Sequence, residues 1–159
     1  MISELPDNIF AGLSNLKELS LGGNKINNLN SNWFSSLQNI EKLSLGENMI
    51  ADLPQNIFSS LTNLQELFLH RNQLTVIHSD SFGNLKKLSK IHLYSNKINE
   101  IDEKLIDKLP LSILDLRYNN VCENEWINDK NEMKTKLKKC FENYQPRVSK
   151  GESNYEGFI

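Results

Sequence analysis

The sequence lacks several features by which proteins are commonly classified. No apolar run approaches the roughly 20 residues needed to span a bilayer, and the opening MISELPDNIF lacks the basic and then apolar layout of a secretory leader. Eighteen basic and 20 acidic residues leave a net charge of −2, which gives no electrostatic reason to bind nucleic acid or an anionic membrane. We therefore expect a soluble chain with no membrane span, whose partner is neither a nucleic acid nor a lipid surface.

Residues typical of catalytic or metal sites are also scarce. There are 2 cysteines and 3 histidines, and no Cys-x-x-Cys pair occurs, so a zinc site would lack ligands. The stretch His78–Ser81 contains a nucleophile, a base and a carboxylate, but catalytic groups usually converge from separate parts of a fold. LGGN at 21–24 does not match the GxGxxG pattern of dinucleotide sites. The sequence predicts no metal, no cofactor and no enzymatic activity.

What the chain does have is one pattern repeated five times. Rows that begin at Leu16, Ile40, Leu64, Leu88 and Leu111 each read LxxLxLxxNxL, with a period of 24 residues except in the fourth row, 88–110, which is one residue short. The pattern resembles the extracellular, 24-residue type of the leucine-rich repeat family over roughly residues 2–121. The resemblance implies an α/β fold, a right-handed leucine-rich repeat solenoid with a curved parallel β-sheet on its concave face.

The facing of side chains follows from the same pattern. Alternate residues of a strand point to opposite sides, so Leu67 and Leu69 are predicted to point inward and Phe68 outward. An internal asparagine ladder is expected to satisfy backbone groups where each strand ends, formed by Asn24, Asn48, Asn72, Asn96 and Asn119. A second apolar spine is expected from Phe10, Phe34, Phe58 and Phe82, each followed three residues later by a leucine. In the fourth row, which is the short one, Ile106 and Leu109 take these places, so the geometry is expected to change near Pro110.

The two ends of the repeat array differ. At the start, Ile2 matches Ile26 and Leu5 matches Leu29, so the chain enters in mid-repeat without a recognisable cap. We expect that a partner covers this edge, that the chain has been trimmed there, or that the chain belongs to a family without such a cap. After Val121 the pattern stops, and Met133, Leu137 and Phe141 follow at helical spacing. We divide the chain into repeats at 1–121, a C-terminal helical cap at 122–144 and a tail at 145–159.

The cap resembles the flanking caps of extracellular leucine-rich repeat proteins, which implies a disulfide between Cys122 and Cys140. Those caps typically carry four cysteines, and the single-bridge form is closer to secreted insect proteins of innate immunity. Free thiols or a metal site are the alternatives for this pair. A persistent disulfide implies a secreted protein or an ectodomain, although no Asn-x-Ser/Thr glycosylation site supports this location. The lysines at 134, 136, 138 and 139 fit a solvated face of the cap helix.

The outward positions of the rows change in character along the chain. The first two rows carry serine and glycine, whereas the later rows carry aromatic rings, histidine and arginine, a composition typical of binding hot spots. The predicted ligand-binding residues are Phe68, His70, Arg71, His92, Tyr94, Arg117 and Tyr118. Variable positions also drift, and these rings are equally compatible with packing only against one another.

The sequence therefore predicts a non-enzymatic, extracellular module that binds a protein ligand on its concave face, for innate recognition or as part of a receptor. One alternative is an inhibitor or scaffold that masks a partner's surface. The other is a targeting domain of a larger signalling protein.

Overall fold

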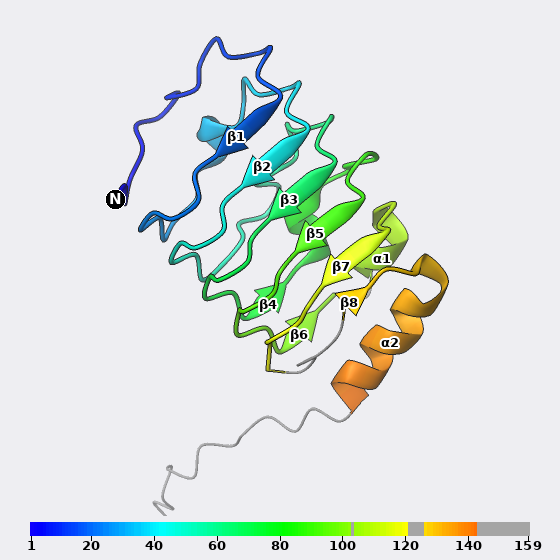
Figure 1. Ribbon diagram of the computed structural model, residues 1–159. Helices are drawn as coiled ribbons and strands as arrows, with labels where there is room; N and C mark the ends of the chain where they lie inside the picture. The colour runs from blue at the N-terminus through cyan, green and yellow to red at the C-terminus, as the bar shows by residue number, and fades with distance from the viewer. Residues whose placement is uncertain (103, 121–125, 143–159) are drawn as a thin grey trace, which may run out of the picture.

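A parallel sheet built from one strand per row organises the chain. The computed structural model describes residues 1–102, 104–120 and 126–142, and Figure 1 shows the strands stacked side by side in chain order. The parallel strands of this sheet are β1 (Glu18–Ser20), β2 (Lys42–Ser44), β3 (Glu66–Phe68), β5 (Lys90–His92) and β7 (Ile113–Asp115). Two short strands, β4 (Val76–Ile77) and β6 (Glu100–Ile101), form a second parallel pair. The predicted solenoid with a parallel sheet is confirmed.

The strands pair without any shift between rows. Leu43 pairs with Leu67, and Leu67 pairs with Ile91, so each inward position lies beside the inward position of the next row. All three side chains are fully buried. Because a slip of one residue would turn every side chain to the opposite face, the burial of this column fixes the register.

Short helical segments and turns lie on the side of the core opposite the sheet. They are the 3-10 helices η1 (Ser31–Trp33) and η2 (Ser79–Phe82) and the helix α1 (Lys104–Lys108). Phe34, Phe58 and Phe82 form the expected spine beneath them, fully buried and with ring centroids 6.0 and 5.9 Å apart. The α-helix occurs in the fourth row, where a change of geometry was expected.

The incomplete repeat that precedes the first row is packed less completely than the rows that follow it. Phe10 is half-buried, and Leu13 is 45% exposed, whereas the equivalent Phe34 and Leu37 are fully buried. In a solenoid each repeat is covered by its neighbour, and no repeat lies beyond Phe10 in the described structure to cover it. The phenylalanine spine is therefore confirmed at Phe34, Phe58 and Phe82 and only partly at Phe10.

The asparagine ladder is confirmed and shows why an amide is needed at the end of each strand. Asn72 donates from Nδ2 to the carbonyl oxygens of Leu45 and Leu69, at 3.0 and 3.1 Å, and its Oδ1 accepts from the N–H of Ile50 at 3.0 Å. Asn48, Asn96 and Asn119 make equivalent bonds. A buried amide thus satisfies backbone groups that the turn leaves without a strand partner.

The last strand of the sheet departs from the expected topology. β8 (Trp126–Ile127) pairs with β7 in the antiparallel direction, because a parallel strand would require a complete crossover connection. The cap helix α2 (Lys130–Glu142) follows, with Met133 and Leu137 buried and Cys140 half-buried against the core. Cys122 lies outside the described residues, so its disulfide with Cys140 stays a prediction, as do the proposed domain boundaries. None of the helices in the described ranges is both long and apolar enough to cross a membrane.

Candidate ligand-binding surface on the sheet

The face of the sheet that points away from the core has two contrasting halves. At the end of β1, just beyond it, and at the end of β2 this face carries small residues, and we call Ser20, Gly22 and Ser44 the shelf. On β3 and β5 and in the residues that follow them it carries four rings, Phe68, His70, His92 and Tyr94, which we call the ring cluster. Register places Phe68 beside Ser44 on one side and beside His92 on the other. The two halves therefore meet between β2 and β3.

The ring cluster consists of two parallel stacks. Phe68 stacks on His92 and His70 stacks on Tyr94, each with a centroid distance of 4.6 Å and nearly parallel planes. Phe68 and His70 meet edge to face at 6.3 Å, which joins the stacks. The ring spacing is close to the roughly 4.8 Å between neighbouring strands. Each ring can therefore lie against the equivalent ring of the next row while the backbone spacing is unchanged.

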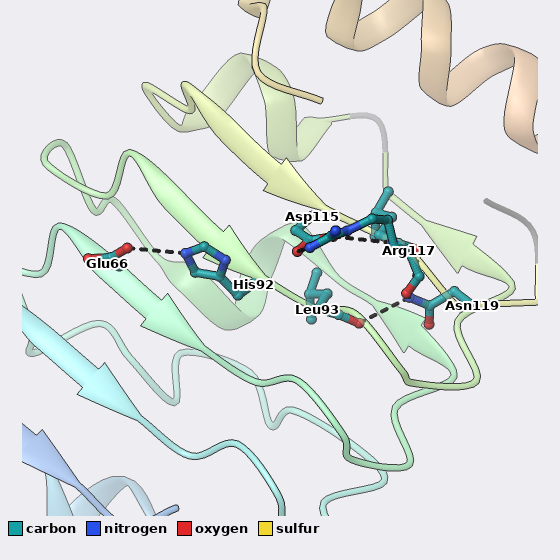
Figure 2. A network of polar contacts seen from close by, with 7 residues as sticks. Glu66, His92, Leu93, Asp115, Arg117 and Asn119 are labelled. Carbon is teal, nitrogen blue, oxygen red and sulfur yellow. Dashed lines mark hydrogen bonds and ion pairs between the residues drawn. The ribbon is translucent and has the colours of Figure 1, made fainter. Parts of the chain in front are cut away.

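Arg117 extends the second stack and is held by a buried carboxylate. Its Nε and Nη2 donate to the two carboxylate oxygens of Asp115 at 2.9 and 2.8 Å, as Figure 2 shows, and its guanidinium carbon lies 5.9 Å from the centre of the Tyr94 ring. The Asp115 side chain is only 1% exposed. A buried carboxylate needs such a partner, and the hydrogen bond and charge of Asp115 raise the pKa of Arg117. The guanidinium is thus positioned in advance, with 37% of the Arg117 side chain exposed.

His92 is anchored from the opposite edge of the sheet face. Its Nε2 lies 3.1 Å from Oε1 of Glu66, and both side chains are largely covered, with 13% and 17% exposed (Figure 2). Lys90 approaches the same carboxylate oxygen at 3.8 Å. Glu66 therefore supports the ring cluster from beside it. The sequence pattern indicated only that Glu66 lies at an outward position.

His70 lies against the backbone of the preceding row. A Cβ atom added to Gly46 would come within 2.4 to 2.7 Å of three atoms of the His70 ring, so only glycine fits beneath this ring. The Nδ1 of His70 is buried and has no hydrogen-bond partner among the described residues. Burial lowers the pKa of His70, the charge of Glu47 opposes this shift, and the charge of Arg71 adds to it. The imidazole is consequently favoured in its neutral form.

The remaining two predicted residues lie at the turn beyond the strands. Arg71 and Tyr118 have positive φ angles of 52° and 57°, as do Glu47 and Ser95 at the equivalent positions of other rows. Arg71 forms an ion pair with Glu47 of the preceding turn, with Nη1 of Arg71 3.0 Å from Oε1 of Glu47. Tyr118 is 67% exposed. Gly23, at the equivalent position of the first row, also has a positive φ angle, of 69°, which glycine adopts without strain.

The seven predicted residues thus do not form one uniform patch. Five belong to the ring cluster and its arginine, and two line the adjoining turn. Sequence reasoning missed the supporting roles of Asp115, Glu66 and Gly46, because they depend on which neighbour each side chain leans toward. The rings do pack against one another, as the alternative interpretation held. This packing also makes the surface rigid. Among the described residues no three histidine, cysteine or acidic side chains gather into a metal-binding group.

Comparison with known proteins identifies the architecture. The leucine-rich repeat family profile matches residues 1–50, 38–98 and 62–121. The chain belongs to the leucine-rich repeat family. No curated protein sequence is significantly similar to it.

Solved structures of leucine-rich repeat proteins align with most of this chain. The TLR13–ssRNA13 complex gives a TM-score of 0.72 at 34% identity over 78% of this chain, and the leucine-rich repeat domain of APL1B gives 0.67 at 28% over 74%. The Toll–Spätzle complex, described as a hub in Drosophila development and innate immunity, gives 0.69 at 28% over 77%. The resemblance to insect immune proteins is therefore confirmed. The alignments cover only 18%, 35% and 17% of those chains.

Proposed function

We propose that this leucine-rich repeat chain is a non-enzymatic, extracellular protein-binding module that holds a protein ligand on the exposed face of its sheet. The observation that carries the proposal is the ring cluster with Arg117, which is confined to three neighbouring rows and organised before any ligand arrives. The proposed ligand-binding residues are Phe68, His70, Arg71, His92, Tyr94, Arg117 and Tyr118.

The physical argument rests on the low entropy of these side chains. Aromatic rings that are already stacked lose little rotamer freedom when a partner covers them, and binding energy is reduced mainly by such ordering. Arg117 is likewise fixed by Asp115, so its guanidinium is held in one orientation before a partner binds. Aromatic residues and arginine are the side chains most often found at binding hot spots. The shelf, by contrast, offers little side-chain area.

The relatives support a role in recognition. The Toll structure is a complex with Spätzle and is described in connection with innate immunity, and we propose a related kind of role, innate recognition or receptor-type ligand binding, for this chain. The extracellular location rests on this similarity and on the proposed disulfide between Cys122 and Cys140.

RNA is a second candidate ligand because the TLR13 structure contains ssRNA. Stacked rings beside an arginine also suit a nucleobase. The charges argue for protein instead. The net charge is −2, and Arg71 and Arg117 are each engaged by a carboxylate, at 3.0 and 2.8 Å, which reduces their availability to phosphate groups.

The test begins with affinity capture from the fluid of the source organism, followed by binding measurements with purified variants. Phe68→Ala and Tyr94→Ala are expected to weaken binding of the captured protein by about 30-fold or more, the loss typical of hot-spot residues. Lys134→Ala and Lys138→Ala on α2 serve as controls and are expected to retain affinity. Unchanged affinity in the ring variants together with a large loss in the lysine variants would place the site on the cap and refute the proposal.

A further inference from the structure

We propose that the shelf receives one aromatic side chain of the protein ligand, which continues the His70–Tyr94 stack toward the N-terminus. This inference rests on the proposed function and goes further by assigning the register and the chemistry of the contact. It depends on how residues 22, 46, 70 and 94 follow one another in the same column of the sheet face.

Each ring in this column leans over the row that precedes it. Three ring atoms of His70 lie at nearly equal distances, 2.4 to 2.7 Å, from the position of a Cβ on Gly46, so one face of the ring covers Gly46. The other face stacks on Tyr94 at 4.6 Å. The ring that would cover Gly22 in the same way belongs to residue 46, which is a glycine and has none. Gly22 is accordingly exposed, whereas Gly46 is buried.

The position above Gly22 has the surroundings that a ring requires. A ring placed there, one row before His70, would face the side of the His70 ring that covers Gly46, at roughly the 4.8 Å spacing of neighbouring strands. The floor is backbone, and the hydroxyl oxygens of Ser44 and Ser20 lie 3.3 and 3.8 Å from where a Cβ on Gly22 would be. Tyrosine and tryptophan combine a flat apolar body with one polar group, which these hydroxyls can bind.

The charges around the shelf select for a neutral ring. Lys17 pairs with Glu41 at 2.7 Å, Lys42 with Glu18 at 3.3 Å and Arg71 with Glu47 at 3.0 Å. The cations that flank the shelf are thus matched by carboxylates, so the phosphate of a nucleotide would meet as much negative as positive charge. An aromatic side chain brings no charge and fits this balance better than a nucleobase with its phosphate.

The experiment is an NMR titration of the full isotope-labelled chain with small probes. N-acetyl-L-tryptophanamide is the aromatic probe, N-acetyl-L-leucinamide is the matched aliphatic control, and adenosine monophosphate tests a nucleotide. We expect tryptophanamide to shift the amide signals of the shelf and to move the His70 ring protons upfield. Leucinamide and the nucleotide are expected to cause smaller changes at the same signals.

Two variants place bulk on the shelf, G22L and S20L, and T75L adds similar bulk at an exposed position away from it. Both shelf variants are expected to abolish the tryptophanamide shifts, and T75L is expected to keep them. Using two shelf variants guards against misfolding of one, and the titration of the unsubstituted chain is decisive by itself. Absence of shelf shifts, equal shifts with leucinamide, or larger shifts with the nucleotide would overturn the inference.

The outcomes also separate this inference from the proposed function. If the captured ligand binds G22L and S20L normally but fails to bind the Phe68→Ala and Tyr94→Ala variants, the shelf assignment is wrong and the proposed function stands. If the ligand is insensitive to all four substitutions, the proposed function itself is wrong. Loss of affinity of about tenfold or more in both shelf variants, with T75L unaffected, supports the inference.

Discussion

The two halves of the sheet face have the same buried core and the same asparagine hydrogen bonds, and they differ in their outward side chains. Leu45 and Leu69 are both fully buried, and Asn48 and Asn72 make the same set of hydrogen bonds one row apart. Outside the core, Ser44 and Gly46 correspond to Phe68 and His70. The inward columns are therefore shared by the two halves, and the difference between the halves lies in the outward columns.

The largest effect is expected from the inward column, and it should be equal in both halves. Leu45→Ala and Leu69→Ala each remove a fully buried side chain between stacked rows, so each is expected to lower the free energy of unfolding by about 2–5 kcal/mol. Urea unfolding measures this change in the free energy of unfolding. The control is Ser44→Ala, at a half-buried position that faces outward. A clear difference in unfolding free energy between the two leucine variants would mean that the cores of the two halves are not equivalent.

The asparagine ladder is the next most sensitive feature. Asn72→Ala removes an amide that bonds Leu45, Leu69 and Ile50, and each buried backbone group left unpaired is expected to cost about 1–3 kcal/mol. Asn48→Ala in the other half should behave alike, as judged by thermal unfolding. Asn27→Ala, at an exposed position, is the control and should leave the midpoint unchanged.

A glycine comparison tests where the two halves begin to differ. Gly46→Ala places a Cβ within 2.7 Å of the His70 ring and is expected to destabilise the chain by about 1–3 kcal/mol while displacing that ring. At Gly22 the nearest atom to an added Cβ is a carbonyl oxygen at 3.2 Å, so Gly22→Ala should be milder. Denaturation together with the NMR signals of His70 measures both effects. Equal effects of the two substitutions would contradict the leaning of His70 over Gly46.

The smallest predicted effect is the pH dependence that His70 of the ring cluster adds to stability. Burial lowers the pKa of His70 from its ordinary 6.5, opposed by the charge of Glu47. Above pH 6.5 the imidazole is neutral in both states. As the pH falls, the unfolded state binds the proton first, so stability is lost until the pH passes through the lowered pKa of the folded state. His70→Phe keeps a ring but should reduce this loss. An unaltered stability profile below pH 6.5 would contradict the prediction.

Much of the fold was predictable from the sequence because every row of the repeat shows again which residues point inward and which point outward. The sequence alone indicated the strands, the inward column and the asparagine ladder, through the period of 24 residues, the leucine alternation and the recurring asparagine. The direction of β8 was not predictable, since the pattern stops before it. Phe10 and Phe34 occupy the same place in the repeat, and only the position of Phe10 at the uncapped edge distinguished them in the sequence; the extent of the difference in burial was not predictable.

The candidate site was predictable in composition but not in geometry. The pattern placed rings and arginines at outward positions, yet each contact depends on the direction in which a side chain leans. His70 covers Gly46, Arg117 folds back to Asp115, and Arg71 turns away toward Glu47. Spacing along the chain gives the row and the column of a residue, and it does not give its rotamer.

Hydrogen exchange of the complex with the captured protein tests the central claim most directly. The amides of β3, β5 and β7 and of the turns that follow them are expected to exchange more slowly in the complex than in the free chain, with smaller changes in α2 and in the segments opposite the sheet. Protection concentrated in α2 or around η1 and η2, with β3 and β5 unchanged, would contradict the assignment of the binding surface to the sheet face.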